Sequence, residues 1–317
     1  MKKSLIALAV LAASGAAMAQ SSVTIYGIAD VWVGRTSETS DVGIKTSTTK
    51  LESGGLNGSR LGFKGTEDLG GGLKAVFALE QGIALDTGAG GSFNRQSYVG
   101  LAGGFGQVTF GNTWTAMDDI LGASNSGFDS ALSASNNVLA VNALYESNPG
   151  NTIKYVSPSF GGFSGGFSHS LDEVSGVKAD VTDFSLSYAA GPVAANFAYQ
   201  LQNDVVDLKL TALNGSYDLG MAKLLASFGQ AKAGALKATD YQIGVDVPLS
   251  SAMTLSAGYA QSKDNAAAGD EKRTGFGVAV GYSLSKRTTT YAGYRQAKVK
   301  NSSEKDSVIA AGIRHTF

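Results

Sequence analysis

The stretch VTIYGIADVWV, residues 23–33, alternates two kinds of side chain with a period of two. One set is apolar or small throughout: Val23, Ile25, Gly27, Ala29, Val31 and Val33. The other set is mixed: Thr24, Tyr26, Ile28, Asp30 and Trp32. Because successive side chains of a strand point to opposite faces, this stretch predicts a β-strand with one apolar and one mixed face. Such strands are typical of a wall between lipid and a polar interior.

The same alternation recurs along the chain, interrupted by turn residues. The expected strands are 23–35, 57–66, 73–82, 93–102, 107–114, 150–158, 163–171, 181–190, 193–202, 208–218, 222–232, 239–248, 252–263, 272–284, 288–298 and 306–317. After the N-terminal region, no run of about eighteen apolar residues predicts a membrane helix. A closed antiparallel barrel satisfies every backbone group in lipid. We therefore expect an all-β, 16-stranded transmembrane barrel, which is wide enough to hold a water channel.

The connections between these strands alternate between short turns and longer polar loops. Short turns are expected at 103–106, 190–192, 249–252 and 284–287. Longer polar loops are expected at 36–50, 264–271 and 300–305. Short turns at one end of a barrel and long loops at the other are typical of outer-membrane barrels.

The N-terminus reads as a secretory signal peptide. Two lysines precede a short apolar run, and Ala17-Met18-Ala19 supplies an A-x-A cleavage site before Gln20. Residues 1–19 are therefore expected to be removed, which leaves 20–317 as a single barrel domain. The chain has no cysteine, so neither disulfides nor zinc-thiolate sites are available. Its net charge of −1 argues against nucleic acid as a partner.

One segment breaks the period-two pattern. Residues 114–146, WTAMDDILGASNSGFDSALSASNNVLAVNALYE, are small, polar and acidic and show no clean strand alternation. Loops of this length are uncommon in compact domains and are usually functional. If the flanking strands close into a barrel, the segment can fold inward and narrow the channel. We therefore expect 114–146 to be a constriction loop.

Several segments, in order along the chain, resemble the general porins of β-proteobacteria and their neisserial relatives. They are SSVTIYGIAD, SRLGFKGTEDLGGGLKAVFALE, RQSYVGLAGGFGQVTFGN, IKYVSPSFGGF and the C-terminal GIRHTF. The resemblance implies a 16-stranded barrel in the bacterial outer membrane, assembled as a homotrimer among lipid and lipopolysaccharide. It also implies a third external loop folded into the lumen, passive diffusion of ions and small hydrophilic solutes, and no enzymatic activity. The terminal Phe317 matches the residue that the β-barrel assembly machinery reads in this family.

Charged residues are the expected functional groups, because ion selectivity in a pore depends on charged rings and pore diameter. By parity, Arg60 and Arg95 point into the lumen, Arg95 on the assumption that Tyr98 faces outward. Both match the basic wall cluster of the family. Lys64 and Lys154 share the inward parity and extend that cluster.

Carboxylates are expected opposite these cations. The segment 114–146 carries Asp118, Asp119 and Asp129, and Asp119 matches the acidic loop position of the family. Asp30 and Glu80 also point into the lumen by parity. Cations on the wall and carboxylates on the loop would create a transverse field in a narrow, weakly screened region.

Two departures from the family pattern leave the preferred ion sign open. The family often has a third wall arginine shortly before IKYVSP, whereas Tyr145-Glu146-Ser147-Asn148 stand here. The glycine after the fifth strand is often followed by arginine, whereas Gly111-Asn112 stand here. With fewer wall cations, strong anion selectivity becomes doubtful.

Three other functions are compatible with a barrel. An outer-membrane hydrolase would need a Ser–His site, but only His169 and His315 exist, and Ser170 points away from its neighbour His169. A substrate-specific channel would need lumenal aromatics, for which Tyr26, Trp32 and Trp114 are candidates. A plugged structural barrel is the third alternative. No metal-ligand spacing or cofactor motif is present.

Overall fold

The computed structural model describes residues 22–173, 175–176, 178–265 and 271–317, so the expected signal peptide 1–19 lies outside the described residues. Within them, no helix is long and apolar enough to cross a membrane. The strands are β1 (Ser22–Thr39), β2 (Lys45–Ser53), β3 (Arg60–Gly70), β4 (Leu73–Gly82), β5 (Gln96–Gly103), β6 (Gly106–Asn112), β7 (Thr152–Val156), β8 (Phe163–Ser170), β9 (Val181–Ala190), β10 (Val193–Gln202), β11 (Leu208–Asp218), β12 (Lys223–Ala233), β13 (Leu236–Pro248), β14 (Met253–Asp264), β15 (Lys272–Ser283), β16 (Thr288–Val299) and β17 (Lys305–Thr316). The helices are α2 (Asp118–Leu121), the 3-10 helix η1 (Gly122–Ser124) and α3 (Ala140–Leu144).

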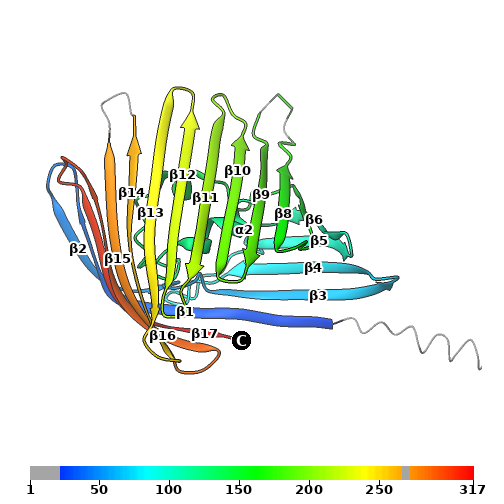
Figure 1. The fold of residues 1–317 in the computed structure, drawn as a ribbon, viewed down its shortest axis with the longest axis horizontal. Helices are drawn as coiled ribbons and strands as arrows, with labels where there is room; N and C mark the ends of the chain where they lie inside the picture. Colours follow the sequence, from blue (N-terminus) through cyan, green and yellow to red (C-terminus); the bar gives the residue numbers. More distant parts are fainter. Residues whose placement is uncertain (1–21, 174, 177, 266–270) are drawn as a thin grey trace, which may run out of the picture.

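These strands form one closed antiparallel sheet. From β3 onward each strand pairs with the next one in sequence, and β1 closes the ring by pairing with β17. β2 and β3 both pair with β1, along its second and first halves, so they are two parts of one wall strand. The barrel therefore has the expected sixteen wall strands. Figure 1 shows β8–β13 on the near wall, crossing the direction of β1, β3 and β4.

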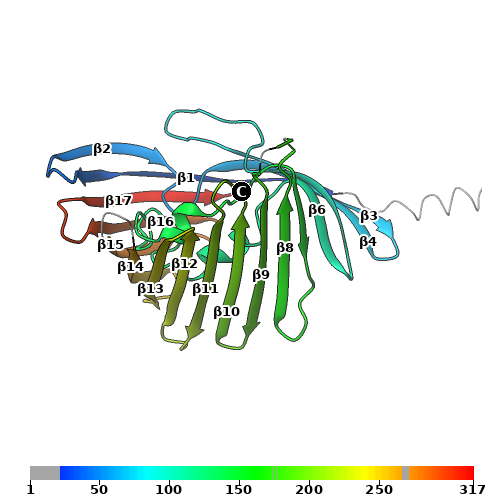
Figure 2. The same ribbon diagram turned by 90° about the horizontal axis from the view of Figure 1, so that it is seen from above.

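The expected loop at 36–50 is wrong. β1 continues to Thr39, the chain turns at 40–44, and β2 returns antiparallel, with Gly34 opposite Lys50. In Figure 2 this hairpin projects to the left alongside β17, with which β1 pairs as far as Thr39. It is rich in Ser and Thr on both faces, so the apolar half of the alternation is absent. Strand pairing, rather than burial, keeps these residues extended.

The two faces of the wall differ as the alternation predicts. Large apolar side chains on one face are exposed, for example Ile25 at 61% and Val99 at 60%. The opposite face is called here the polar face, and it carries the buried Asp30, Glu80, Asp183, Gln200, Asp240, Ser256 and Arg295. The apolar belt faces outward in a transmembrane barrel, so the polar face lines its interior.

The break between β2 and β3 is held by Asp30, which is fully buried. Its carboxylate accepts hydrogen bonds from the backbone N–H groups of Gly55 (3.1 Å), Leu56 (2.8 Å) and Asn57 (2.8 Å). It also accepts one from the hydroxyl of Tyr291 at 2.6 Å. Parity placed Asp30 correctly on the inner face. Its contacts, however, are with residues 54–59, which connect β2 to β3 and are called here the crossing segment. Asp30 therefore anchors this segment and is not an open lumenal charge.

Asp30→Ala should therefore destabilise the barrel. Removing the carboxylate leaves three buried N–H groups without acceptors, and each costs about 1–3 kcal/mol. The midpoint of urea unfolding in detergent micelles should fall clearly. Asp68→Ala is the control, because Asp68 accepts one exposed hydrogen bond, from Gly70 N–H. Equal midpoints for the two variants would contradict this role for Asp30.

Candidate pore constriction

The long connection between β6 and β7 contains α2, η1 and α3 and includes the expected segment 114–146. Its first residues are bound to the polar face of β8 and β9. The N–H of Ala116 donates to Ser168 Oγ at 3.0 Å, and that of Met117 donates to Asp183 Oδ1 at 3.0 Å. Asp183 and Ser168 are 1% exposed. The beginning of the segment is thus anchored by side chains that the wall supplies.

The middle of the segment reaches β14 and β16, far from β6 around the ring. Gly127 N–H donates to Ser256 Oγ at 2.6 Å. Arg295 Nε donates to the carbonyl of Ala131 at 3.0 Å, while Ala131 N–H donates to the carbonyl of Gly55 at 2.9 Å. The segment tip is therefore bound on both sides, by the wall and by the crossing segment 54–59.

The end of the segment returns along β13 and β10. Val141 N–H donates to Asp240 Oδ2 at 2.8 Å. The amide of Gln200 clamps Glu146, accepting from its N–H at 2.8 Å and donating to its carbonyl at 2.9 Å. Figures 1 and 2 show the short helices of the segment beside the strands of this wall. Side chains of the polar face thus replace strand pairing for a segment that has none.

Glycines on the polar face let the segment approach the wall closely. A Cβ on Gly258 would lie 1.7 Å from Ser126 Oγ, and one on Gly244 would lie 2.5 Å from Ser126 Cβ. A Cβ on Gly277 would lie 2.3 Å from the carbonyl oxygen of Leu132. None of these distances is sterically allowed. Part of the high glycine content of the chain therefore serves contact between wall and segment.

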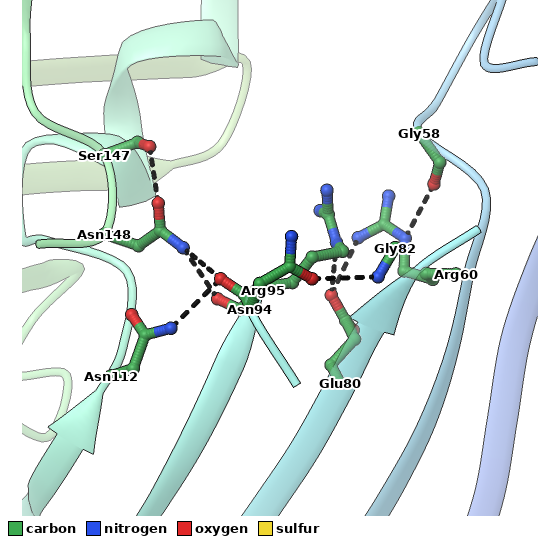
Figure 3. A network of polar contacts seen from close by, with 9 residues as sticks. All are labelled: Gly58, Arg60, Glu80, Gly82, Asn94, Arg95, Asn112, Ser147 and Asn148. Atoms are coloured by element: carbon green, nitrogen blue, oxygen red, sulfur yellow. Dashed lines mark hydrogen bonds and ion pairs between the residues drawn. The ribbon is translucent and has the colours of Figure 1, made fainter. Parts of the chain in front are cut away.

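The expected wall cations Arg60 and Arg95 lie together around Glu80 (Figure 3). Arg95 Nε is 2.7 Å from Glu80 Oε1, and Arg60 Nη1 is 3.7 Å from the same oxygen. Glu80 is 2% exposed. All three residues lie on the inner face, as expected from the sequence. Glu80 lies between the two arginines and compensates part of their charge, which the sequence alone does not show.

Arg95 is further fixed by the ends of the segment. Its guanidinium lies 4.9 Å from the centre of the Trp114 ring. Asn148 Nδ2 donates to the carbonyls of Asn94 and Arg95, at 2.9 and 3.1 Å (Figure 3). The outward assignment of Tyr98 is wrong, because the exposed Val99 and Leu101 define the outer face of β5. Arg95 precedes that strand, and its contacts rather than strand parity direct it inward.

Among the loop acids, Asp119 pairs with a wall cation. Lys154 Nζ is 2.7 Å from the Asp119 carboxylate, and the lysine side chain is largely buried while the aspartate side chain is 38% exposed. Burial raises the pKa of Asp119, and the attraction of Lys154 opposes that shift. This contact joins the wall and the segment directly.

Asp118 accepts a hydrogen bond from the hydroxyl of Tyr145 at 2.9 Å. Burial raises the pKa of its carboxyl to about 6, while that hydrogen bond acts in the opposite direction. Asp129 accepts from Asn125 Nδ2 at 2.5 Å, and burial raises its pKa as well. Asp129 has no cation within ion-pair distance among the described residues. It is thus a folding contact within the segment.

The remaining candidates have simpler surroundings. Lys64 Nζ lies 5.0 Å from the centre of the Tyr26 ring, on the polar face. His169 contacts Thr182 Oγ1 at 2.8 Å, and His315 contacts Thr288 Oγ1 at 2.9 Å, so neither bonds a serine. In the part of the chain that the structure describes, no cluster of His, Asp and Glu could hold a metal ion.

Sequence reasoning missed Arg314 and the wall residues that bind the segment. Arg314 lies on the polar face of β17, where its guanidinium donates to Asn57 Oδ1 at 2.7 Å. Arg314 directly follows Ile313, whose side chain is exposed on the outer face, so the period-two alternation predicts that Arg314 points inward. The wall anchors Asp183, Asp240 and Gln200 carried no such signal, because a polar residue of inward parity is expected at any height of a water-filled barrel.

Comparisons with known proteins agree with this architecture. A family model described as Gram-negative porin matches residues 5–302. Outer membrane porin protein 32 of Delftia acidovorans is 37% identical over 290 residues, covering 82% of this chain and 80% of that protein. The major outer membrane protein P.IB of Neisseria gonorrhoeae is 37% identical over 201 residues, covering 62% and 56%. The solved anion-selective porin from Comamonas acidovorans superposes with a TM-score of 0.82 at 28% identity, covering 94% of this chain and all of that one.

A closed 16-stranded barrel with an apolar belt and a charged interior is the architecture of an outer-membrane diffusion channel. The chain belongs to the Gram-negative porin family. It is a channel of the Gram-negative outer membrane, through which ions and small hydrophilic solutes diffuse passively, and not an enzyme.

Gly258→Ala should displace the segment from the wall while leaving the barrel intact. The new methyl group would overlap Ser126, and Ser126 belongs to the segment rather than to the sheet. Limited proteolysis of the folded protein should cut the segment faster than in the wild type. Gly104→Ala is the matched control, because nothing lies within 4 Å of its added Cβ. Equal cleavage rates for both variants would contradict the close contact.

Proposed function

We propose that the segment 114–146 folds into the barrel lumen and forms the constriction of the channel. The observation that carries the proposal is its set of hydrogen bonds to the polar face, from β8 to β16. That face lines the interior of a closed barrel. A segment bonded to it over so many strands has its place inside.

The polar contacts support a crescent-shaped opening between the segment and the wall formed by β3–β7. On the wall side lie Arg60, Arg95 and Lys154, and on the segment side lie Asp118 and Asp119. Because Lys154 and Asp119 touch, they close one end of the opening. Arg60 and Arg95 share Glu80 on the wall side of the opening. Charges of opposite sign on opposing sides orient water and dipolar solutes.

We propose a mild anion preference at neutral pH. Glu80 compensates one of the two guanidinium charges, and Asp119 compensates Lys154. The four cations Arg60, Arg95, Lys64 and Lys154 therefore face three carboxylates at the opening, Glu80, Asp118 and Asp119, which leaves one positive charge in excess among these residues. The similarity to a porin described as anion-selective supports the same sign. Such a preference is weaker than that of a pore with an uncompensated arginine cluster.

The assembly expected from the family completes the proposal. The channel would function as a homotrimer embedded in lipid and lipopolysaccharide, after removal of residues 1–19. Phe317 would be read by the β-barrel assembly machinery. In the folded chain it exchanges two backbone hydrogen bonds of 3.1 Å with Gly27, and its ring covers that glycine, so the terminal residue completes the pairing of β17 with β1.

Planar-bilayer recordings test the constriction. The refolded protein should give large ohmic conductance steps, and Arg60→Gln and Arg95→Gln should each shift the reversal potential in a KCl gradient toward cations. The expected change in the anion-to-cation permeability ratio is roughly twofold, from Coulomb's law in water for one charge about 8 Å from the ion path, screened over about one Debye length at physiological salt. Arg273→Gln, in an exposed ion pair with Glu271 outside the cluster, is the control. Unchanged ratios in both lumenal variants would overturn the proposal.

Acidification should increase the anion preference. Asp118 has a pKa raised to about 6, so it is charged at pH 7.5 and mostly neutral at pH 5. Lowering the pH through this range removes a negative charge from the segment side. The permeability ratio of the wild type should rise between pH 7.5 and 5, and Asp118→Asn should show the higher ratio already at pH 7.5. A variant with the full wild-type pH dependence would exclude Asp118 as the titrating group.

A further inference from the structure

Arg314 occupies the same side of the lumen as the wall cations of the proposed constriction. It lies on β17, directly opposite Asp30 of β1 in the pairing register. Arg60, at the start of β3, is opposite Ile28 of the same strand. Since Ile28 and Asp30 are two residues apart and share a face, Arg314 and Arg60 flank β1 at neighbouring heights. The row formed by Arg60 on β3, Arg95 just before β5 and Lys154 on β7 thus continues by one more wall strand beyond β1.

The crossing segment 54–59 contacts all three arginines. Asn57 Oδ1 accepts a hydrogen bond from Arg314 Nη1 at 2.7 Å. The carbonyl of Gly58 accepts one from Arg60 Nε at 3.0 Å. The guanidinium of Arg95 also borders this turn, because a Cβ on Gly58 would lie 3.3 Å from its Nη1. Asn57 and Gly58 therefore lie next to all three guanidinium groups.

The charge of Arg314 is compensated differently from the others. Arg60 and Arg95 lie within ion-pair distance of Glu80, and Lys154 pairs with Asp119. Within the described ranges, no carboxylate lies within 4.0 Å of Arg314. Its neighbour Asp30 is already bound by three N–H groups and the Tyr291 hydroxyl. Arg314 instead donates its orienting hydrogen bond to a neutral amide oxygen, which fixes the guanidinium without a direct ion pair.

We infer that Arg314 is a further selectivity-determining residue of the pore, and that Asn57 is its positioning residue. The guanidinium offers a site for small permeating anions, such as chloride or a carboxylate, on their path past Arg60 and Arg95. This inference rests on the proposed constriction.

The test compares charge-removing variants by reversal potential in a KCl gradient. Arg314→Gln should lower the anion-to-cation permeability ratio roughly twofold, the Coulomb estimate used for Arg60. Arg314→Lys, which keeps the charge, should stay near the wild-type ratio. Arg287→Gln is the matched control, since it removes one arginine charge from an exposed turn at the same end of the barrel. Each variant is first checked for a folded, heat-modifiable barrel.

A second variant keeps the test decisive if Arg314→Gln does not fold. Asn57→Asp retains Arg314 but places a carboxylate against it, and it should lower the ratio to the same extent. Wild-type ratios in Asn57→Asp and Arg314→Gln, with a shifted ratio in Arg60→Gln, would overturn the role of Arg314 and leave the constriction standing. An equal shift in Arg287→Gln would also overturn it. Unchanged ratios in Arg60→Gln and Arg95→Gln as well would refute the constriction and the inference together.

Discussion

Hydrogen bonds from inward-pointing side chains of the barrel wall to the backbone of the segment 114–146 are the interaction on which the rest of the structure depends. The segment has almost no regular secondary structure, so its N–H and C=O groups need partners from elsewhere. Asp183, Asp240, Ser256, Gln200 and Arg295 supply them. Without these bonds, a long polar loop would gain more from full hydration than from contact with the wall.

The wall in turn is shaped to receive the segment. Glycines of β13, β14 and β15 remove the methyl groups that would keep Ser126 and Leu132 away. On the opposite side of the lumen, the crossing segment 54–59 holds the tip through Gly55 and is itself held by Asp30. In the constriction proposed above, the steric and electrostatic features of the channel follow from this same set of contacts.

Much of this architecture follows from the sequence alone, because a period-two pattern between lipid and a polar interior is a strong local signal. The sequence predicts the sixteen wall strands and the inward direction of Arg60 and Glu80. It also shows that residues 114–146 lack the strand alternation of the rest of the chain. The β1–β2 hairpin was not predictable, because its residues lack an apolar face. Asp30 and Glu80 could be placed on a face but not assigned partners, since those partners come from residues distant in sequence. Arg314 was within reach of the same parity argument that placed Arg60.

The central claim, that the segment 114–146 rests against the inner face of the barrel, is tested most directly by a disulfide bond between the segment and β14. The chain has no cysteine, so Ser126→Cys and Gly258→Cys introduce the only pair. The Ser126 Cβ lies 2.5 Å from the Cβ position of residue 258, and a shift of about 1 Å would bring the pair to disulfide geometry. We expect the bond to form in the folded barrel and to hold single-channel conductance near the wild-type value. Reduction should then raise the conductance, because the Cβ at position 258 displaces the segment as in Gly258→Ala. Failure of the bond to form in a folded barrel, or a conductance of the bonded protein several-fold above the wild type, would contradict a segment that rests against this wall.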